Sequence, residues 1–228
     1  MKVLIACEES QRVCIEMRKL GHEAYSCDIQ EPSGGHPEWH ILGDVLQILN
    51  WKDHGNNCGG IWFKTMDGQF HTIDKWDMII AHPPCTYLSN AGSVRLVVKG
   101  VLNEERYQKG LQARDFFMSI IAAECERICI ENPVPNKRFN MPKYTQIIEP
   151  YFFGDPFKKK TCLWLKGLPK LQPTNIVEPL GSWVSGGSKD GKGNVRKQLG
   201  IHHSAKDRAK TFPGIAKAMA EQWAGQEE

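Results

Sequence analysis

The stretch Trp76-Asp77-Met78-Ile79-Ile80-Ala81-His82-Pro83-Pro84-Cys85 is the strongest indication of how this chain folds. Its run from residue 76 to 81 is short and very apolar, which is typical of a strand buried on both faces of a parallel sheet. The two prolines fix φ and stiffen the turn that follows. The stretch therefore predicts a buried strand whose carboxyl end carries a histidine and a rigidly presented thiol.

The rest of the chain repeats the alternation of apolar strands and helices. We expect further strands at residues 2–7, 23–29, 127–130 and 161–165, and helices at residues 10–20, 104–124 and 209–223, the last interrupted early by Pro213-Gly214. Strands that alternate with helices predict an α/β fold, in which a mostly parallel sheet is flanked by helices on both faces.

Two segments depart from this alternation. Residues 58–75 place Asp67-Gly68 between alternating residues, which predicts a β-hairpin inserted before the central strand. Residues 181–204 are rich in Gly, Ser, Lys and His, which is typical of a flexible loop. With 228 residues, the chain is expected to form a single domain over residues 1–228 that carries both insertions.

The composition narrows the class of protein. A hydrophobic content of 41% and a charged content of 24% are ordinary for a globular protein, and the net charge of +3 permits a polyanionic partner without requiring one. No apolar run approaches the roughly 20 residues of a membrane span. The eight cysteines include no CxxC pair, so we expect reduced thiols, no metal site and a cytoplasmic location.

Four side chains of functional type are expected at one edge of the sheet. Asp28, Asp44, Cys85 and Glu131 fall at the carboxyl ends of predicted strands or just beyond them. Ligands of open α/β sheets bind in the crevice outside these ends. Their shared position is a stronger indication of a site than any one of them alone.

The pairing of Cys85 with Glu131 suits the alkylation of cytosine at C5. A thiolate that adds to C6 while an acid protonates N3 makes C5 nucleophilic, and Cys85 and Glu131 supply these two groups. One or two of the three lysines at residues 158–160 are expected to contact the base carbonyl oxygen or a phosphate. In isolation, Cys85 is better read as a buried core cysteine and Glu131 as a capping or paired carboxylate; their pairing favours catalysis.

These residues resemble the S-adenosylmethionine-dependent cytosine-C5 methyltransferases, and most closely the short, phage-type DNA cytosine methyltransferases. The matching stretches occur in the family's order along nearly the whole chain: residues 3–10, 27–29, 44, 82–89, 131–133, 158–165 and 211–220. The most specific of them are Pro83-Pro84-Cys85 and Glu131-Asn132.

The resemblance implies a Rossmann-like methyltransferase fold, S-adenosyl-L-methionine as methyl donor and the activity of a DNA (cytosine-5)-methyltransferase. It implies a cofactor site made by Ala6, Cys7, Glu8, Ser10, Asp28, Ile29, Asp44, His82, Pro83, Gly214, Ile215 and Ala218. Asp28 would bind the ribose hydroxyls and Asp44 the adenine. With Cys85 and Glu131 as catalytic residues, the substrate site would include Pro83, Pro84, Ser89, Asn132, Pro133, Lys158 and Lys160.

Three departures from the family pattern bear on the function. The glycine-rich first turn is replaced by Cys7-Glu8-Glu9-Ser10, and lysines replace the arginines expected near the base. The target-recognition segment is reduced to residues 167–208. The hairpin, the flexible loop, or a partner chain or dimer would then supply recognition of DNA, either as a duplex with a flipped cytosine or as a single strand.

Two alternatives remain open at the level of sequence. One is a catalytically decayed nucleic-acid-binding or decoy protein, suggested by the altered first turn and the small recognition segment. The other is a pyrimidine-nucleotide alkylating enzyme that acts on single-stranded or free nucleotide substrates. For the enzyme, the expected location is the cytoplasm of a bacterium or of a phage-infected cell.

Overall fold

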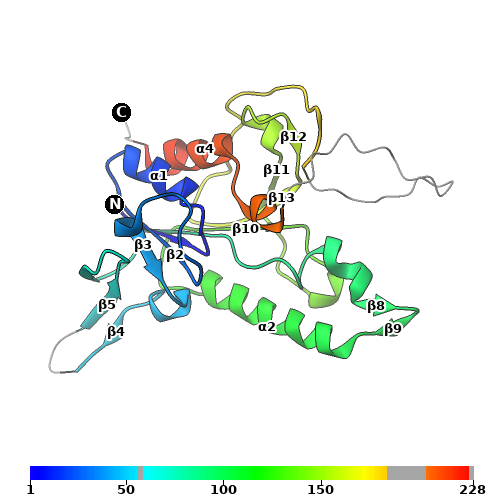
Figure 1. The fold of residues 1–228 in the computed structure, drawn as a ribbon, viewed down its shortest axis with the longest axis horizontal. Coiled ribbons are helices and arrows are strands. Elements are labelled where there is room, and N and C mark those ends of the chain that lie inside the picture. The colour runs from blue at the N-terminus through cyan, green and yellow to red at the C-terminus, as the bar shows by residue number, and fades with distance from the viewer. Residues whose placement is uncertain (56–58, 184–203, 226–228) are drawn as a thin grey trace.

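A seven-stranded sheet forms the centre of the protein in the computed structural model, which describes residues 1–55, 59–183 and 204–225 (Figure 1). Its strand order is β11-β13-β10-β7-β1-β2-β3. The strands are β1 (Lys2–Ala6), β2 (Glu23–Asp28), β3 (His40–Leu42), β7 (Met78–Ala81), β10 (Ile128–Pro133), β11 (Gln146–Ile148) and β13 (Thr161–Lys166).

The sheet is mostly parallel, as the sequence predicts. β1 pairs in parallel with both β2 and β7, and parallel pairs also join β2 to β3 and β7 to β10. β13 is the exception, because it runs antiparallel between β10 and β11. The strand order reverses direction between β1 and β7, and a crevice at such a switch point is where open α/β sheets bind ligands.

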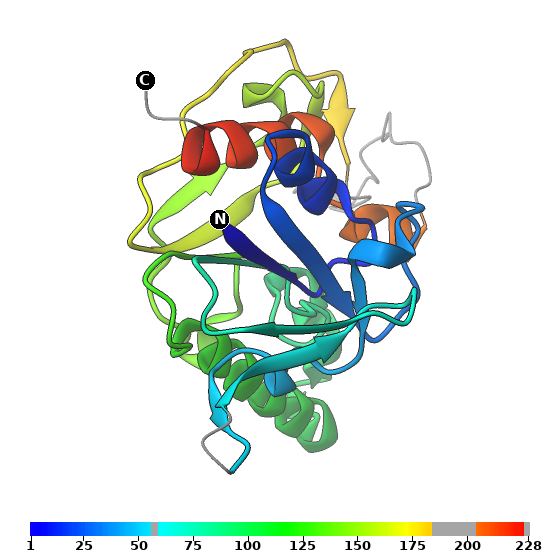
Figure 2. The same cartoon turned by 90° about the vertical axis from the view of Figure 1, so that its left-hand side faces the viewer.

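Helices cover both faces of the sheet, although they are few. α1 (Arg12–Lys19) and α4 (Pro213–Ala224) pack on one face, and α2 (Glu104–Ile121) packs on the other (Figure 2). Alternate residues of β1 explain this arrangement, since Val3 and Ile5 join the core under α1 and α4 while Leu4 joins the core under α2. Continuous apolar strands are therefore needed to bury both faces.

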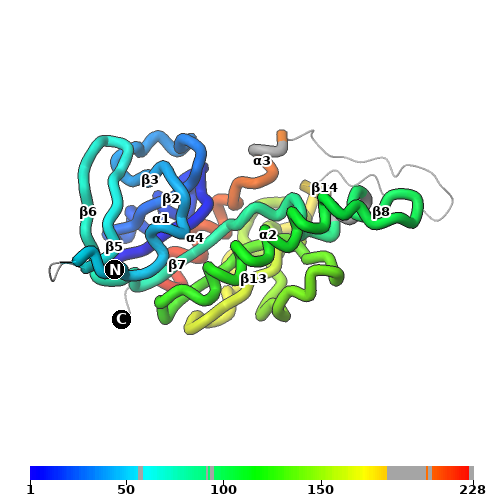
Figure 3. The backbone as a smooth tube through the Cα atoms, turned by 90° about the horizontal axis from the view of Figure 1, so that it is seen from below, coloured from blue at the N-terminus to red at the C-terminus, as the bar shows by residue number. Residues whose placement is uncertain are grey.

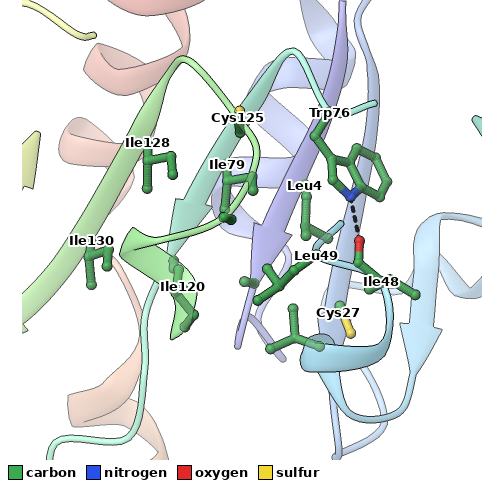
Figure 4. Close-up of a cluster of buried hydrophobic side chains, with 14 of the residues drawn as sticks. Leu4, Cys27, Ile48, Leu49, Trp76, Ile79, Ile120, Cys125, Ile128 and Ile130 are labelled. Atoms are coloured by element: carbon green, nitrogen blue, oxygen red, sulfur yellow. Dashed lines mark hydrogen bonds between the residues drawn. The ribbon is translucent and has the colours of Figure 1, made fainter. Parts of the chain in front are cut away.

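The core under α2 contains aliphatic residues of the sheet together with Trp76 and Trp164; Figure 4 shows the part around Trp76. Ile79 and Ile128 from the sheet lie beside Ile120 from α2, and all three are fully buried. Trp76 donates its indole Nε1–H to the carbonyl oxygen of Ile48 at 2.7 Å, which satisfies the polar atom of an otherwise apolar side chain.

The smaller elements are short strands and single helical turns. The additional strands are β4 (Lys52–Asp53), β5 (Gly59–Lys64), β6 (Phe70–Ile73), β8 (Val97–Val98), β9 (Val101–Leu102), β12 (Phe157–Lys158) and β14 (Gly181–Ser182). The short helices are η1 (Pro37–Trp39), η2 (Val45–Gln47), η3 (Asn90–Arg95), η4 (Lys137–Phe139), η5 (Pro150–Phe152) and α3 (Ala205–Ala209).

The two irregular segments are placed as follows. β5 and β6 pair antiparallel to form a hairpin, and its turn contains Gly68 at φ 93°. This hairpin lies at the opposite end of the molecule from the β8–β9 hairpin, which follows the Cys85 turn (Figures 1 and 3). The loop predicted at residues 181–204 falls mostly outside the described residues. No helix in the described part of the chain has the length and apolar character to cross a membrane.

The last predicted helix needs one correction. The helix expected over residues 209–223 begins only at Pro213, as α4, and Ala209 is the last residue of the separate α3. Proline is favourable in the first turn of a helix, where its missing N–H has no partner to lose. Pro213 therefore begins α4, and the three residues before it form a link that passes beside the candidate site.

Candidate active site

A cavity of about 610 Å³ opens at the carboxyl ends of the parallel strands, at the switch point between β1 and β7. Most of the predicted site residues line it: Cys7, Asp28, Ile29, Asp44, His82, Pro83, Pro84, Cys85, Glu131, Asn132 and Pro133. They come from the ends of five neighbouring strands. The structure thus brings the separate motifs together around one space.

A smaller cavity of about 300 Å³ adjoins the first. It is lined by Glu8 and Ser10 of the first turn, and it shares Cys7, Asp28 and His82 with the larger cavity. The predicted cofactor residues are therefore divided between two connected spaces.

Four predicted cofactor residues line neither cavity. Ala6 is fully buried within β1, and Ile215 and Ala218 belong to the core between α4 and the sheet. A Cβ atom on Gly214 would overlap the backbone of Phe153, so this glycine is required for close packing. Ile215 and Ala218 are apolar because they bury α4, whereas Ala6 packs in the core under α2. A role of these four residues near a cofactor stays a prediction.

Three predicted substrate residues also lie outside the cavity. Ser89 lies in the turn after the Cys85 motif, where its backbone N–H donates to the carbonyl oxygen of Cys85 at 2.9 Å. Lys158 and Lys160 are exposed, whereas the middle residue of the run, Lys159, lines the cavity. Successive residues of an extended chain point in opposite directions, which explains why one lysine faces inward and its neighbours do not.

Several cavity residues were not expected from the sequence. Arg208 lies in α3 and Phe116 in α2, and neither belongs to a recognisable motif. Thr211 lines the smaller cavity, and its carbonyl oxygen accepts a 2.6 Å hydrogen bond from the Arg12 guanidinium. Thr211 belongs to the matching stretch 211–220 and Lys159 to the lysine run, but neither pattern showed that these residues would line a cavity.

The Cys85 turn is tied to the neighbouring strand by Asn132. Its side-chain amide donates to the carbonyl oxygen of Pro83 at 2.9 Å, and Asn132 is only 3% exposed. The parallel register of β7 with β10, in which Ala81 is opposite Ile130, brings this pair together. The proline turn and the Glu131-Asn132 motif are therefore one structural unit, and the asparagine fixes where the thiol lies.

The thiol of Cys85 is protonated in the free protein. Burial raises its pKa above the ordinary value, and the nearby charge of Lys159 opposes that effect without overcoming it. A thiol is a weak nucleophile until it ionises. Any nucleophilic role for Cys85 therefore needs its proton to be removed once a ligand is bound.

Glu131 and His82 form a buried pair. Nδ1 of His82 lies 3.0 Å from Oε2 of Glu131, and the two side chains are 9% and 11% exposed. Burial would raise the pKa of Glu131, but the hydrogen bond to His82 and the charge of Lys159 lower it below its ordinary value. Burial would likewise lower the pKa of His82, yet the bond and charge of Glu131 raise it. Both shifts favour an ionised carboxylate beside a protonated imidazole.

The first turn has an unusual geometry for its sequence. Cys7 adopts φ 58° and Gln11 φ 57°, a left-handed conformation that non-glycine residues adopt uncommonly. Between them, Glu8 accepts hydrogen bonds from the backbone N–H groups of Val13 at 2.7 Å and Cys14 at 3.2 Å. The Glu8 carboxyl therefore occupies the amino end of α1, which in other α/β folds is free to bind an anionic ligand.

Two carboxylates define the other end of the larger cavity. Oδ1 of Asp28 accepts from the backbone N–H of Gln30 at 2.9 Å, and Oδ1 of Asp44 accepts from the N–H of Leu46 at 3.0 Å. Each carboxylate is thus held by the turn after its strand. An acidic residue at the end of the second strand is the group that binds ribose hydroxyls in dinucleotide-binding folds.

Comparisons with known proteins add no family to these observations. No family model matches the chain, and no curated protein matches it. Within the described residues, no group of three or more His, Cys, Asp or Glu side chains is placed to hold a metal ion.

Proposed function

We propose that this protein transfers a methyl group from S-adenosyl-L-methionine to C5 of cytosine in DNA. The observation that carries the proposal is the position of Cys85 and Glu131 on neighbouring turns of a cavity whose other end holds Asp28 and Asp44. A nucleophile and an acid then face one part of the space, and two carboxylates that suit a nucleoside face the other.

The fold supports this proposal. The strands β3-β2-β1-β7-β10 follow the order 3-2-1-4-5 of nucleotide-binding α/β folds, and the cavity lies at the switch point of that order. We therefore infer a Rossmann-like fold, to which the antiparallel β13 adds a strand that the simple pattern lacks.

The residues present fit a nucleoside-containing cofactor. Asp28 offers a carboxylate to ribose hydroxyls, Asp44 offers one to an adenine amino group, and Cys7 and His82 line both cavities. Because Glu8 occupies the amino end of α1, the carboxylate of a methionine moiety must be held elsewhere. When bound, S-adenosylmethionine would supply an electrophilic methyl group.

The chain's own residues would then activate the base. The thiol proton of Cys85 leaves to water, the sulfur bonds to C6, and Glu131 gives a proton to N3, so that C5 becomes nucleophilic. After alkylation, loss of the C5 proton to water, of the thiolate from C6 and of the N3 proton back to Glu131 restores the ring. Lys159 favours the thiolate through its charge.

The substrate class follows from access to the cavity. A base inside a duplex cannot reach a buried thiol, so a cytosine would have to be flipped out of the helix or come from a single strand. Lys159 and Arg208 at the cavity would favour a phosphate near the base. A partner chain or a dimer would add the recognition surface that a short segment lacks.

The test is transfer of tritium-labelled methyl groups from S-adenosylmethionine to duplex DNA, single-stranded DNA, RNA and free dCMP. We expect label in DNA, recovered as 5-methylcytosine, and none with Cys85→Ala. Glu131→Gln should retain the fold and lower the rate by about 10²- to 10⁴-fold, the usual contribution of a general acid. Near-wild-type turnover by Glu131→Gln would contradict its role.

The substrate panel also separates the alternatives. Label in free dCMP alone would identify a nucleotide-modifying enzyme. If no substrate is labelled, while wild-type protein and Cys85→Ala bind DNA equally well, the chain would be a binding protein. The Glu8 carboxyl at the end of α1 is the observation that favours this second candidate, because it alters the expected cofactor contact.

A further inference from the structure

His82 is held so that its hydrogen-bonding side faces Glu131. Nδ1 lies 3.0 Å from Oε2 of Glu131 and 3.5 Å from the hydroxyl of Thr211. The other ring nitrogen, Nε2, is buried and has no hydrogen-bond partner among the described residues. The ring position is thus determined by the carboxylate, through the one nitrogen that can exchange a proton with it.

The charges around His82 come from each element packed against it. Glu131 from β10 and Glu8 from the first turn favour the imidazolium, whereas Lys159, ahead of β13, disfavours it. Thr211, ahead of α4, contributes a neutral hydroxyl that stabilises the Glu131 carboxylate. Nδ1 of His82 and Oε2 of Glu131 are close enough to share one proton, and the raised pKa of His82 together with the lowered pKa of Glu131 favours its position on the imidazole.

This arrangement conflicts with a simple acid role for Glu131. The proposed reaction needs a proton on the carboxyl when cytosine N3 becomes basic, yet Lys159 and His82 both favour the ionised carboxylate in the free protein. A general acid must hold its proton when the reaction begins. The proton therefore has to reach Glu131 from a neighbouring group.

We propose that His82 stores the proton that Glu131 delivers to cytosine N3, an inference that rests on the proposed function. The Nδ1–H bond of His82 breaks as an O–H bond forms on Glu131, which leaves a neutral imidazole and a neutral carboxyl. That O–H bond then breaks as N3–H forms and the Cys85 sulfur adds to C6. On elimination the N3 proton returns to Glu131 and then to His82, so the pair is restored.

In this scheme His82 is a positioning residue that acts through Glu131, and its ionisation matters as well as its hydrogen bond. The substitution His82→Asn separates the two properties. An asparagine amide can donate from a position close to Nδ1, but it cannot give up a proton. His22→Asn is a matched control, because His22 lies between α1 and β2, outside the β5–β6 hairpin, and lines neither cavity.

The first readout is release of tritium from C5 of labelled cytosine in DNA without added methyl donor, which reports addition to C6 and protonation of N3. We expect His82→Asn to lower this release, and methyl transfer, by about 10²-fold or more. His22→Asn should stay within about twofold of wild type, and thermal melting checks that each variant is folded. Wild-type rates in His82→Asn would show that the hydrogen bond suffices, which overturns the storage role.

The second readout is the charge of His82 in the free protein, measured from its ring ¹⁵N chemical shifts as pH is varied. We expect an imidazolium at pH 7 in wild type and a neutral ring in Glu131→Gln, where burial acts without the carboxylate. A neutral ring in wild type at pH 7 overturns the proposal, even if His82→Asn fails to fold.

The two proposals can fail separately. If wild-type protein neither exchanges tritium nor transfers methyl groups on any cytosine substrate, the proposed function fails and the storage role fails with it. If wild type is active and His82→Asn equals it, the proposed function stands and the storage role alone is wrong.

Discussion

Replacing Glu8 with glutamine should change how the stability of the protein depends on pH. Glu8 is 3% exposed, and burial raises the pKa of its carboxyl from 4.5 to about 7, against the opposing effects of His82 and of the two N–H groups of α1. The folded protein therefore binds a proton that the unfolded chain has already released above pH 5. A group of this kind stabilises the fold at low pH and loses that contribution as pH rises through 7.

The magnitude follows from the size of the shift. Each pKa unit corresponds to 1.36 kcal/mol, so the change in pKa of Glu8 from 4.5 to about 7 is linked to about 3 kcal/mol of unfolding free energy. Between pH 5 and pH 8, the unfolding free energy of the wild-type protein should fall by about 2 to 3 kcal/mol more than that of Glu8→Gln. For a chain of this size, about 2–4 °C of melting temperature accompanies each kcal/mol.

The assay is urea unfolding of wild type, Glu8→Gln and a control at several pH values between 5 and 8. Glu16→Gln is the control, because Glu16 lies on the same helix but pairs with Lys19 at the surface. When unfolding free energy is plotted against pH, the Glu16→Gln curve should run parallel to the wild-type curve. The Glu8→Gln curve should converge on the wild-type curve or cross it as pH rises. Parallel curves for all three proteins would mean that the N–H groups of α1 keep Glu8 ionised, and the reasoning would be refuted.

Three further predictions concern the core and the cavity. Phe117→Ala should lower the unfolding free energy, measured with urea, by about 3–5 kcal/mol because it leaves a cavity at a fully buried site. Met118→Ala removes the neighbouring, half-exposed side chain and should lower it far less. Lys159→Met should lower the rate of methyl transfer roughly tenfold or more, because loss of the ammonium group raises the pKa of Cys85 further. Lys160→Met should keep a rate close to wild type, and equal losses in the two variants would contradict the inward placement of Lys159. Asp28→Asn should weaken calorimetric binding of S-adenosylmethionine by about 1–3 kcal/mol, and unchanged affinity would remove Asp28 from the cofactor site.

The apolar strands could be predicted because both of their faces are buried. Continuous runs such as the one in β7 are needed when helices cover both sides of a sheet, and such runs are visible in a single sequence. Their end residues then lie at one edge by the geometry of a parallel sheet, which is why Asp28, Cys85 and Glu131 were expected together.

The short strands and the direction of β13 could not be predicted in the same way. β3 and β11 each have three residues, too few for a periodic pattern, and they form strands because a longer neighbour offers hydrogen bonds. β13 has a clear apolar run, but strand direction depends on the path of the connecting chain. Long-range pairing of this kind leaves no local mark in the sequence.

The functional motifs are least informative where an apolar pattern also serves packing. Ile215 and Ala218 repeat at helical spacing because α4 buries them against the sheet, and that pattern says nothing of a cofactor. Conversely, Arg208 reaches the larger cavity from α3 and Thr211 reaches the smaller one from the link between α3 and α4, and no periodic pattern marks either as a cavity residue. Periodicity therefore identifies what is buried, and only the folded chain identifies what faces the cavity.

The register between β7 and β10 explains why the two motifs must be interpreted together. Ala81 lies opposite Ile130, so the next residues along the parallel strands place His82 beside Glu131, and Asn132 reaches back to Pro83. The residue before the two prolines thus determines which charges the carboxyl meets, although it is 49 positions away in the chain. With a small apolar residue at position 82, burial alone would keep the Glu131 carboxyl protonated. With histidine there, the proton can move between the two side chains of the pair. The acid strength of Glu131 is therefore a property of both strands, and a motif search that finds either one alone cannot state it.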